Sequence, residues 1–175
     1  LCENISSDAN VSILTLNDNK GLNIMRHTLT AQVLAKALKN LYPNVKLAIG
    51  PTIENGFYYD FDLGDDNISE NDFPKIEKKF MFFATQKNDF KMKFWSKFDA
   101  CEYYKKEKNP YKLELIENLN DGEITFCNHS DFTDLCKGGH IPHTGLVKAI
   151  KLTNIAGAYW KGDENNKQLT RIYGI

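Results

Sequence analysis

The chain has 175 residues, of which 42% are apolar, and this is enough to bury one hydrophobic core in a compact α+β unit. Its 22 basic and 23 acidic residues leave a net charge of -1, which excludes the chain-wide positive field of a free-standing nucleic-acid-binding protein. A nucleic-acid partner would therefore need local lysine patches.

The cysteines and the apolar runs predict a reducing, cytoplasmic setting. Cys2, Cys101, Cys127 and Cys136 are scattered without the dense spacing of a disulfide scaffold. The sequence has neither a secretory apolar segment nor a run of about 18 apolar residues, so we expect no membrane span. Because it starts at Leu1 rather than Met, we expect it to be one piece of a longer polypeptide.

Local patterns in the first third predict strands around one helix. Residues 11–16, VSILTL, alternate and are rich in β-branched side chains, which predicts a short strand followed by a turn at NDNKG. Apolar side chains recur at helical spacing over residues 28–41, and Pro43 ends that helix. VKLAIG and NGFYYDF, residues 45–50 and 55–61, predict two strands before an acidic loop.

The middle of the chain predicts two more helices and a strand. Asp72 is expected to cap a helix over residues 73–88. Residues 89–96 alternate like a half-buried strand, and Asp99 is expected to cap a helix over residues 100–109 that stops at Pro110. The final third predicts strands within residues 123–129, 146–160 and 168–175, with KGDENNK as a hairpin turn.

The segment DLCKGGH places Cys136 and His140 four residues apart with two glycines between them. A thiol and an imidazole at this spacing could be metal ligands, or a polar pair around a water molecule. Structural zinc needs four ligands, and the other histidines are His27, His129 and His143. The metal-free pair is favoured because four ligands are not visibly present.

A second candidate lies at the start of the predicted helix, in MRHTLTAQVLAKALKNLYP. Two histidines four residues apart on a helix would present both imidazoles on one face. Here His27 is followed by Ala31 and Gln32, and a glutamine amide is neither a base nor a useful zinc ligand. For His27 a functional role and a half-buried helix-initiating role both stay open.

Three further side chains are candidates. Lys112 and Asp134 are titratable, although most such residues are solvated surface charges. In NGFYYDF, strand alternation sends Tyr58 and Tyr59 to opposite faces, so one tyrosine hydroxyl is expected to point into a pocket.

Three longer segments carry a family resemblance. LYPNVKLAIGPTIENGFYYDFD, FTDLCKGGH and IKLTNIAGAYWKGDENNKQLTRIYG together resemble the editing domain of bacterial threonyl-tRNA synthetase, a second additional domain that alanyl-tRNA synthetase shares in related form. The segment GAYWKGDENNKQLTRIYG distinguishes the threonyl from the alanyl domain. The resemblance covers residues 27–175, and residues 1–26 resemble the end of a preceding ubiquitin-like domain with its linker. It implies an α+β fold in which a mixed, mainly antiparallel sheet packs with a long helix and two or three further helices.

The resemblance also implies a reaction, the hydrolysis of serine wrongly attached to threonine tRNA. One missing methyl group is worth only about 1–3 kcal/mol of discrimination, so a second site must remove the error. The implied substrate-binding residues are Tyr59, Gln32 and Thr28. The implied catalytic residues are Cys136, His140, Lys112, Asp134 and His27, without a firmly bound metal or other cofactor.

The chain departs from the family pattern at the helix start, where members usually read R-H-S/T-x-A-H-L-L-A. Counting back from LYP puts Gln32 at the second histidine and Thr28 at the first, with His27 one residue out of register. An extra residue near Leu29 would let His27 resume the first role at the cost of a bulge. Since the second histidine is absent, we expect impaired editing; a catalytically silent, tRNA-positioning domain and an unrelated zinc-binding module are the alternatives.

In this family, aminoacylation with its ATP and zinc belongs to a catalytic core that we expect beyond Ile175. The enzymes are usually homodimers through that core. The resemblance therefore implies that this chain alone is a monomer whose partner is threonine tRNA.

Overall fold

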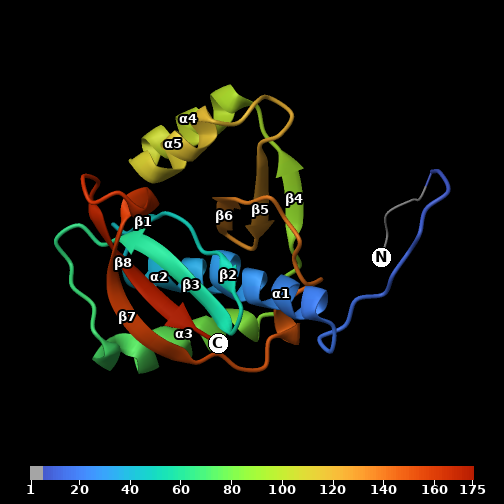
Figure 1. Cartoon of the computed structure of the whole chain (residues 1–175), viewed down its shortest axis with the longest axis horizontal. Helices are drawn as coiled ribbons and strands as arrows, with labels where there is room; N and C mark the ends of the chain where they lie inside the picture. The colour runs from blue at the N-terminus through green and yellow to red at the C-terminus, as the bar shows by residue number, and fades with distance from the viewer. Residues whose placement is uncertain (1–5) are drawn as a thin grey trace.

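The computed structural model describes residues 6–175, so Cys2 and the other residues before Ser6 lie outside it. Residues 6–16 are exposed and run away from the body of the molecule (Figure 1). The predicted strand at residues 11–16 is wrong, because a strand is held by ladder hydrogen bonds and this segment pairs with no strand in the described chain. Its apolar side chains stay in solvent, with Ile13 86% exposed.

The long helix starts nine residues earlier than its apolar pattern predicts. It runs through α1 (Asn19–Thr28), a π-helical segment η1 (Leu29–Leu34) and α2 (Ala35–Leu41). The turn predicted at residues 17–21 is found only at its start, where the Asp18 carboxylate accepts a 2.8 Å hydrogen bond from the Thr15 backbone N–H; residues 19–21 form the first turn of the helix. The predicted domain boundary between residues 26 and 27 falls inside this helix.

A five-stranded antiparallel sheet packs against the long helix. The predicted strands at residues 45–50 and 55–61 are confirmed as β1 and β3, and β2 between them was not predicted. The hairpin at KGDENNK is confirmed, since the Trp160 N–H donates to the Lys167 carbonyl at 3.0 Å. The order is β1-β3-β8-β7, with β2 paired to β3, and the strands are β1 (Lys46–Leu47), β2 (Thr52–Ile53), β3 (Gly56–Asp62), β7 (Leu152–Tyr159) and β8 (Gln168–Gly174).

A separate three-stranded antiparallel sheet has the order β4-β5-β6, from β4 (Lys91–Phe94), β5 (Thr125–His129) and β6 (Phe132–Leu135). The strand predicted at residues 89–96 exists as β4, but every residue of β4 is exposed rather than half-buried. The predicted strand at residues 123–129 is confirmed as β5. β6 was not predicted, since its four residues are too few for a period to show.

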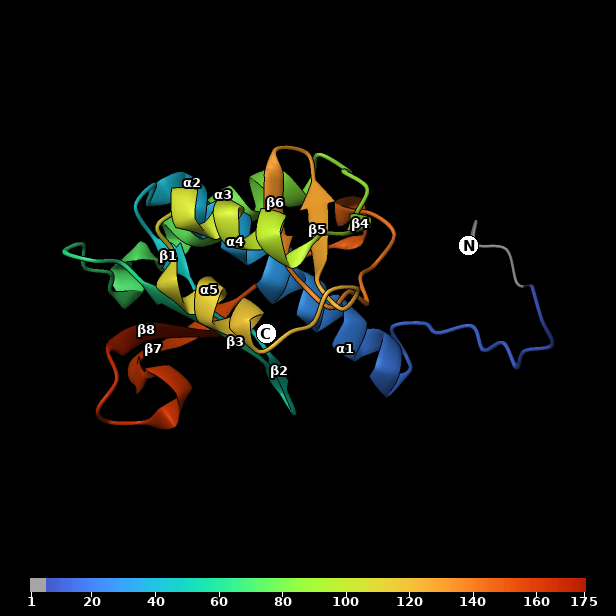
Figure 2. The same ribbon diagram turned by 90° about the horizontal axis from the view of Figure 1, so that it is seen from above.

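Two short helices, α4 (Lys97–Lys106) and α5 (Pro110–Glu117), lie together beside this small sheet (Figure 2). Ser96, not Asp99, caps α4, because its side chain accepts from the Asp99 backbone N–H. Pro110 starts α5 rather than only ending the helix before it. Its missing N–H costs nothing at a first helical position, and the Asn109 side chain caps that turn by accepting from the Lys112 N–H.

The predicted helix over residues 73–88 is α3 (Phe73–Ala84), which stops short of the expected end. Asp72 precedes it without capping it through its side chain. Instead its carboxylate accepts from the Ser69 N–H at 2.9 Å in the short turn η2 (Glu70–Asp72).

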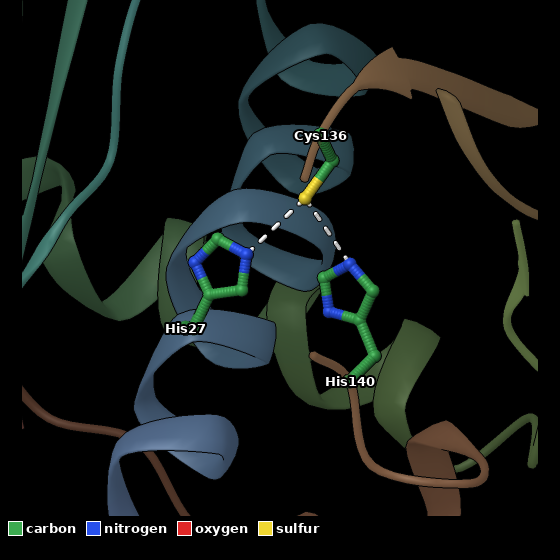
Figure 3. Close-up of side chains that lie close together, drawn as sticks. All are labelled: His27, Cys136 and His140. Atoms are coloured by element: carbon green, nitrogen blue, oxygen red, sulfur yellow. Dashed lines mark hydrogen bonds between the residues drawn. The ribbon is translucent and has the colours of Figure 1, made fainter. Parts of the chain in front are cut away.

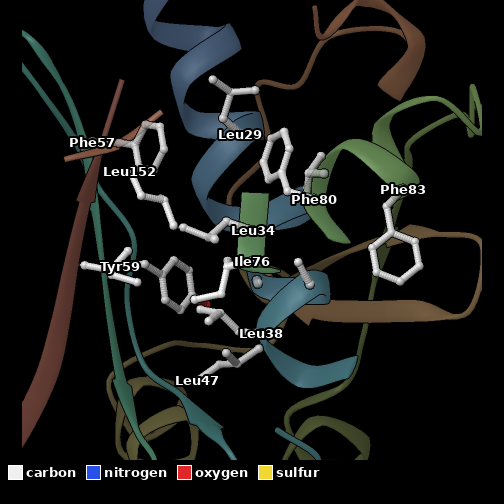
Figure 4. Close-up of a cluster of buried hydrophobic side chains, with 14 of the residues drawn as sticks. Leu29, Leu34, Leu38, Leu47, Phe57, Tyr59, Ile76, Phe80, Phe83 and Leu152 are labelled. Carbon is white, nitrogen blue, oxygen red and sulfur yellow. The ribbon is translucent and has the colours of Figure 1, made fainter. Parts of the chain in front are cut away.

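The main core lies between the long helix, α3 and the five-stranded sheet (Figure 4). Leu34 and Leu38 of the helix are fully buried, and Phe57 and Phe61 of β3 oppose them. The buried face of α3 is the predicted one: Ile76, Phe80 and Phe83.

The opposite side of the long helix meets the small sheet, because Ala31 packs on Cys127 and Cys136. The helix thus separates two sheets, and the predicted α+β class with a long helix and further helices is confirmed. Within residues 6–175 no helix is long and apolar enough to cross a membrane.

Candidate active site

The π-helical segment η1 sets the direction of His27. The Ala35 N–H bonds to the Thr30 carbonyl, five residues back, so this turn holds one residue more than an α-helical turn. This is the bulge near Leu29 that would let His27 take the first histidine position of the motif. Just before this segment in the chain, His27 points to Cys136, with its Nε2 3.2 Å from Cys136 Sγ.

Cys136, His27 and His140 meet in one cluster (Figure 3). The Cys136 sulfur lies 3.2 Å from His27 Nε2 and 3.2 Å from His140 Nε2. The two rings stack with centroids 5.0 Å apart at 10°. Two segments more than a hundred residues apart in the chain therefore form one site, with the glycine turn after β6 facing the helix.

Burial keeps the three groups uncharged at neutral pH. Burial first, and the neighbouring His27 and His129 next, lower the pKa of His140 to about 3. Burial also lowers the pKa of His27 and raises that of the Cys136 thiol. A thiol between two neutral imidazoles can donate to one ring and accept from the other.

Thr28 determines which imidazole accepts the Cys136 S–H and which one donates to the sulfur. Its hydroxyl donates to the Ile24 carbonyl at 2.9 Å, so the oxygen accepts from the Ile141 N–H and from His140 Nδ1, each at 3.2 Å. His140 therefore carries its proton on Nδ1 and accepts the Cys136 S–H at Nε2. The sulfur then accepts from Nε2–H of His27, whose Nδ1 is left with a free lone pair.

Lys112 and Asp134 form a buried ion pair. Lys112 Nζ lies 2.8 Å from Asp134 Oδ2, and both side chains are 5% exposed. The Tyr104 hydroxyl donates to the other carboxylate oxygen at 2.7 Å and accepts from the Leu135 N–H. Tyr104 was missed by the sequence analysis, because its partners lie about thirty positions away with no local spacing to reveal them.

A cavity of about 670 Å³ adjoins these groups and is lined by His27, Tyr59, Lys112, Asp134 and Cys136, together with the strand connection at residues 48–52, the end of α5 and Lys137. This volume suits a small-molecule group. Tyr59 is 1% exposed, and burial, followed by the charge of Asp134, raises its pKa. The expectation that a tyrosine from NGFYYDF reaches a pocket is confirmed for Tyr59.

The remaining candidates, His140, Thr28 and Gln32, do not line the cavity. His140 and Thr28 support Cys136 from behind. Gln32 is fully buried, and its Oε1 lies 3.1 Å from Nδ1 of His129. From the sequence, His129 was a candidate only as a metal ligand. Strand alternation could have indicated its direction, since Cys127 and His129 share one face of β5.

A metal would find three donor atoms here. The ligand atoms of His27, Cys136 and His140 lie within 4.8 Å of one another, a nitrogen and sulfur set that suits zinc. A fourth protein ligand that would close a structural zinc site does not join this group within residues 6–175.

Comparison with known proteins finds a family model that matches the last third of the chain. Residues 124–173 match the family described as the threonyl and alanyl tRNA synthetase second additional domain. The matched residues hold Asp134, Cys136 and His140, whereas His27 and Lys112 lie outside them.

Curated proteins extend the similarity along nearly the whole chain. The threonine--tRNA ligase of Flavobacterium johnsoniae is 55% identical over 170 residues, which is 97% of this chain and 26% of the relative. That of Cytophaga hutchinsonii is 54% identical over 171 residues, 98% of this chain and 26% of the relative. That of Porphyromonas gingivalis is 47% identical over 172 residues, with coverage of 98% and 26%. The chain thus spans about a quarter of the length of the relatives it matches.

The cavity depends on a missing side chain at Gly50. A Cβ at that position would lie 2.2 Å from Tyr59 Cδ2 and 2.6 Å from Thr30 Oγ1. We expect Gly50→Ala to lower the free energy of unfolding by about 1–3 kcal/mol, the usual cost of overpacking. Gly157→Ala is the matched control, because its Cβ would meet only the flexible side chain of Gln168. Urea unfolding measures both, and equal values for the two variants would contradict the expected clash.

His129 should make stability depend on pH. Burial, followed by the charge of Lys36, lowers its folded-state pKa to about 4, so the unfolded chain binds this proton more readily. Stability is therefore lost as the pH falls from about 6.5 towards 4, by about 3 kcal/mol from this group. Urea unfolding at pH 7 and pH 4 should show a smaller loss for His129→Asn than for the unchanged chain. Equal losses would contradict the assignment.

Proposed function

We propose that this chain is the editing domain of a bacterial threonyl-tRNA synthetase and hydrolyses the ester bond of Ser-tRNA(Thr). The main support is the convergence of an imidazole, a thiol and a buried ammonium–carboxylate pair on one cavity. An aminoacylating site separates serine from threonine by one methyl group, worth about 1–3 kcal/mol, so a hydrolytic site is needed.

In the proposed reaction a water molecule lies between His27 Nδ1 and the ester carbonyl. Nδ1 takes one proton from the water as its oxygen bonds to the carbonyl carbon, giving a tetrahedral intermediate. Collapse of the intermediate breaks the bond to the ribose oxygen, which leaves with the proton returned by His27. The products are free serine and tRNA.

The ion pair has a positioning and electrostatic role in this scheme. One Nζ hydrogen of Lys112 is engaged by Asp134, and the others can donate into the cavity, to the water or to the developing oxyanion. Asp134 can accept from the serine amino group. Because both charges are formed and fixed before substrate arrives, little reorganisation is required during the reaction.

Gln32 is the reason to expect slow hydrolysis of Ser-tRNA(Thr). The family's second histidine is replaced by an amide that cannot transfer a proton, so one of the expected titratable groups is absent. The same substitution favours the alternative of a catalytically silent domain that positions tRNA for the rest of the ligase.

Deacylation of Ser-tRNA(Thr) and Thr-tRNA(Thr) by the unchanged chain and by Gln32→His tests the proposal. We expect slow hydrolysis of the serine ester, no hydrolysis of the threonine ester and a faster serine reaction for Gln32→His. If neither protein hydrolyses the serine ester, the silent role holds. If the substitution leaves a measurable rate unchanged, Gln32 is not what limits it.

As part of such a ligase, the chain would act in the cytoplasm with threonine tRNA as partner. ATP and zinc would then serve the remainder of the enzyme, through which homodimers would form. The isolated chain would be a monomer, which its sedimentation can test.

A further inference from the structure

The Tyr104 hydroxyl joins the backbone of β6 to the carboxylate of Asp134. It accepts from the Leu135 N–H at 2.7 Å and donates to Asp134 Oδ1 at 2.7 Å. A backbone N–H can only donate, so the direction of these bonds is set from the Leu135 end. Burial, followed by the charge of Asp134, also raises the pKa of Tyr104 well above its usual value, so the hydroxyl keeps the proton that it donates.

Two donors hold the Asp134 carboxylate by different oxygens. Lys112 Nζ lies 2.8 Å from Oδ2, and the Tyr104 hydroxyl occupies Oδ1. Pairing with Cys127 in the small sheet fixes the Asp134 backbone, so the rotation that remains is that of the carboxylate about its last bond. This torsion is intrinsically broad, and one donor alone would leave the plane of the carboxylate loosely set. The second donor sets it.

The Tyr104 ring has support that does not depend on its hydroxyl. It is 3% exposed, stacks on Phe126 with centroids 5.6 Å apart and meets the Tyr103 ring at 77°. The Lys112 ammonium has less support, because it ends a flexible four-carbon chain and its one acceptor within residues 6–175 is Asp134. The rigid ring can therefore order the carboxylate, and the carboxylate can order the ammonium.

We propose that Tyr104 is a positioning residue for this site, whose hydroxyl orients the Asp134 carboxylate and, through it, the Lys112 ammonium. Asp134 and Lys112 line the cavity and Tyr104 does not, so Tyr104 acts through them. In the proposed reaction this ammonium donates to the water or to the developing oxyanion, where its exact position matters. The effect on hydrolysis rests on the proposed function; the orientation of the ion pair does not.

Tyr104→Phe and Tyr103→Phe in the 175-residue chain form a matched pair of variants. Each removes one hydroxyl from neighbouring rings that both contact Phe126. The Tyr103 hydroxyl, however, donates to the Thr133 carbonyl at 3.2 Å and not to Asp134. A loss that follows only from removing a tyrosine hydroxyl in this cluster should therefore be common to both variants.

Three measurements separate positioning from packing. Proton–nitrogen NMR of the Lys112 side-chain ammonium, assigned by its loss in Lys112→Arg, reports the geometry of the ion pair. Thermal unfolding shows that each variant is folded at the assay temperature. Steady-state deacylation of Ser-tRNA(Thr) gives kcat.

In Tyr104→Phe we expect the Lys112 ammonium resonance to shift and kcat to fall by about 10–100-fold, up to the loss that a misplacement of about 1 Å can cause. Tyr103→Phe should match the unchanged chain in both measurements. An unshifted Lys112 resonance in a folded Tyr104→Phe would overturn the inference. So would a shifted resonance that leaves a measurable kcat unchanged, or an equal fall in kcat for the two variants.

If Tyr104→Phe does not fold, the unchanged chain decides. Its Tyr104 hydroxyl proton should be visible by NMR and show a cross-peak to the Leu135 amide proton, and the absence of that signal would overturn the inference. If the unchanged chain lacks deacylase activity, the proposed function fails, and the Lys112 resonance alone decides whether Tyr104 orients the ion pair.

Discussion

Replacing Lys112 with methionine is expected to lower the free energy of unfolding by about 3–5 kcal/mol, the cost of breaking a buried ion pair by removing one partner. The Lys112 and Asp134 side chains are each 5% exposed, so water cannot replace the lost ammonium. Asp134 would retain only the Tyr104 hydroxyl among its side-chain partners described here. Urea unfolding at pH 7 measures the change.

The matched control is Lys105→Met. Lys105 pairs with Glu102 at 2.9 Å, but the two side chains are 63% and 41% exposed. Water and salt screen an exposed pair of this kind, so the control should be nearly as stable as the unchanged chain. If Lys112→Met lowered the free energy of unfolding by less than about 1 kcal/mol, the Lys112–Asp134 pair would contribute no more than an exposed ion pair, which would contradict the prediction.

His27→Gln is expected to lower kcat for Ser-tRNA(Thr) hydrolysis by about 10²-fold or more, the usual contribution of a general base. A glutamine amide nitrogen can still donate to Cys136 Sγ in place of His27 Nε2, so the cluster keeps its hydrogen bond. The variant loses the lone pair at His27 Nδ1. That lone pair is free because Thr28 orients His140, and His140 in turn orients the Cys136 thiol.

His143→Gln serves as the control for this activity loss. His143 is a half-buried histidine next to the short turn η3 (Thr144–Leu146) and does not line the cavity. It should keep the rate of the unchanged chain. Equal rates for His27→Gln and the unchanged chain would exclude His27 as the base and leave the catalytic water to another group.

The fold class and the cluster of candidate residues could be predicted from the sequence because they rest on strong local signals. Apolar periodicity located the buried faces of the long helix and of α3, and alternation located β3, β5 and β8. Motif register left two alternatives, Thr28 in the first histidine position or His27 with one extra residue near Leu29, and the π-helical segment provides that extra residue. The register alone could not show whether Thr28 or His27 would reach Cys136. In the structure His27 contacts the sulfur and Thr28 contacts His140.

The failures have a common cause in tertiary context. Residues 11–16 have the composition of a strand, but no neighbouring strand pairs with them in the described chain. From the sequence, Pro110 could equally end one helix or begin the next. The Asn109 side-chain cap makes it the first residue of α5. Tyr104 and His129 act through partners about 30 and 97 positions away in the chain. Contacts of that kind are set by packing and leave no spacing to read.

A time course of Ser-tRNA(Thr) deacylation, run with the unchanged chain, with Cys136→Ala and with buffer alone, tests the proposed hydrolytic site most directly. The ester should disappear faster with the unchanged chain than in buffer, and Cys136→Ala, still folded by circular dichroism, should be slower than the unchanged chain because His27 loses the acceptor that holds its ring. The proposed site would be contradicted if the unchanged chain were no faster than buffer, or if Cys136→Ala were as fast as the unchanged chain.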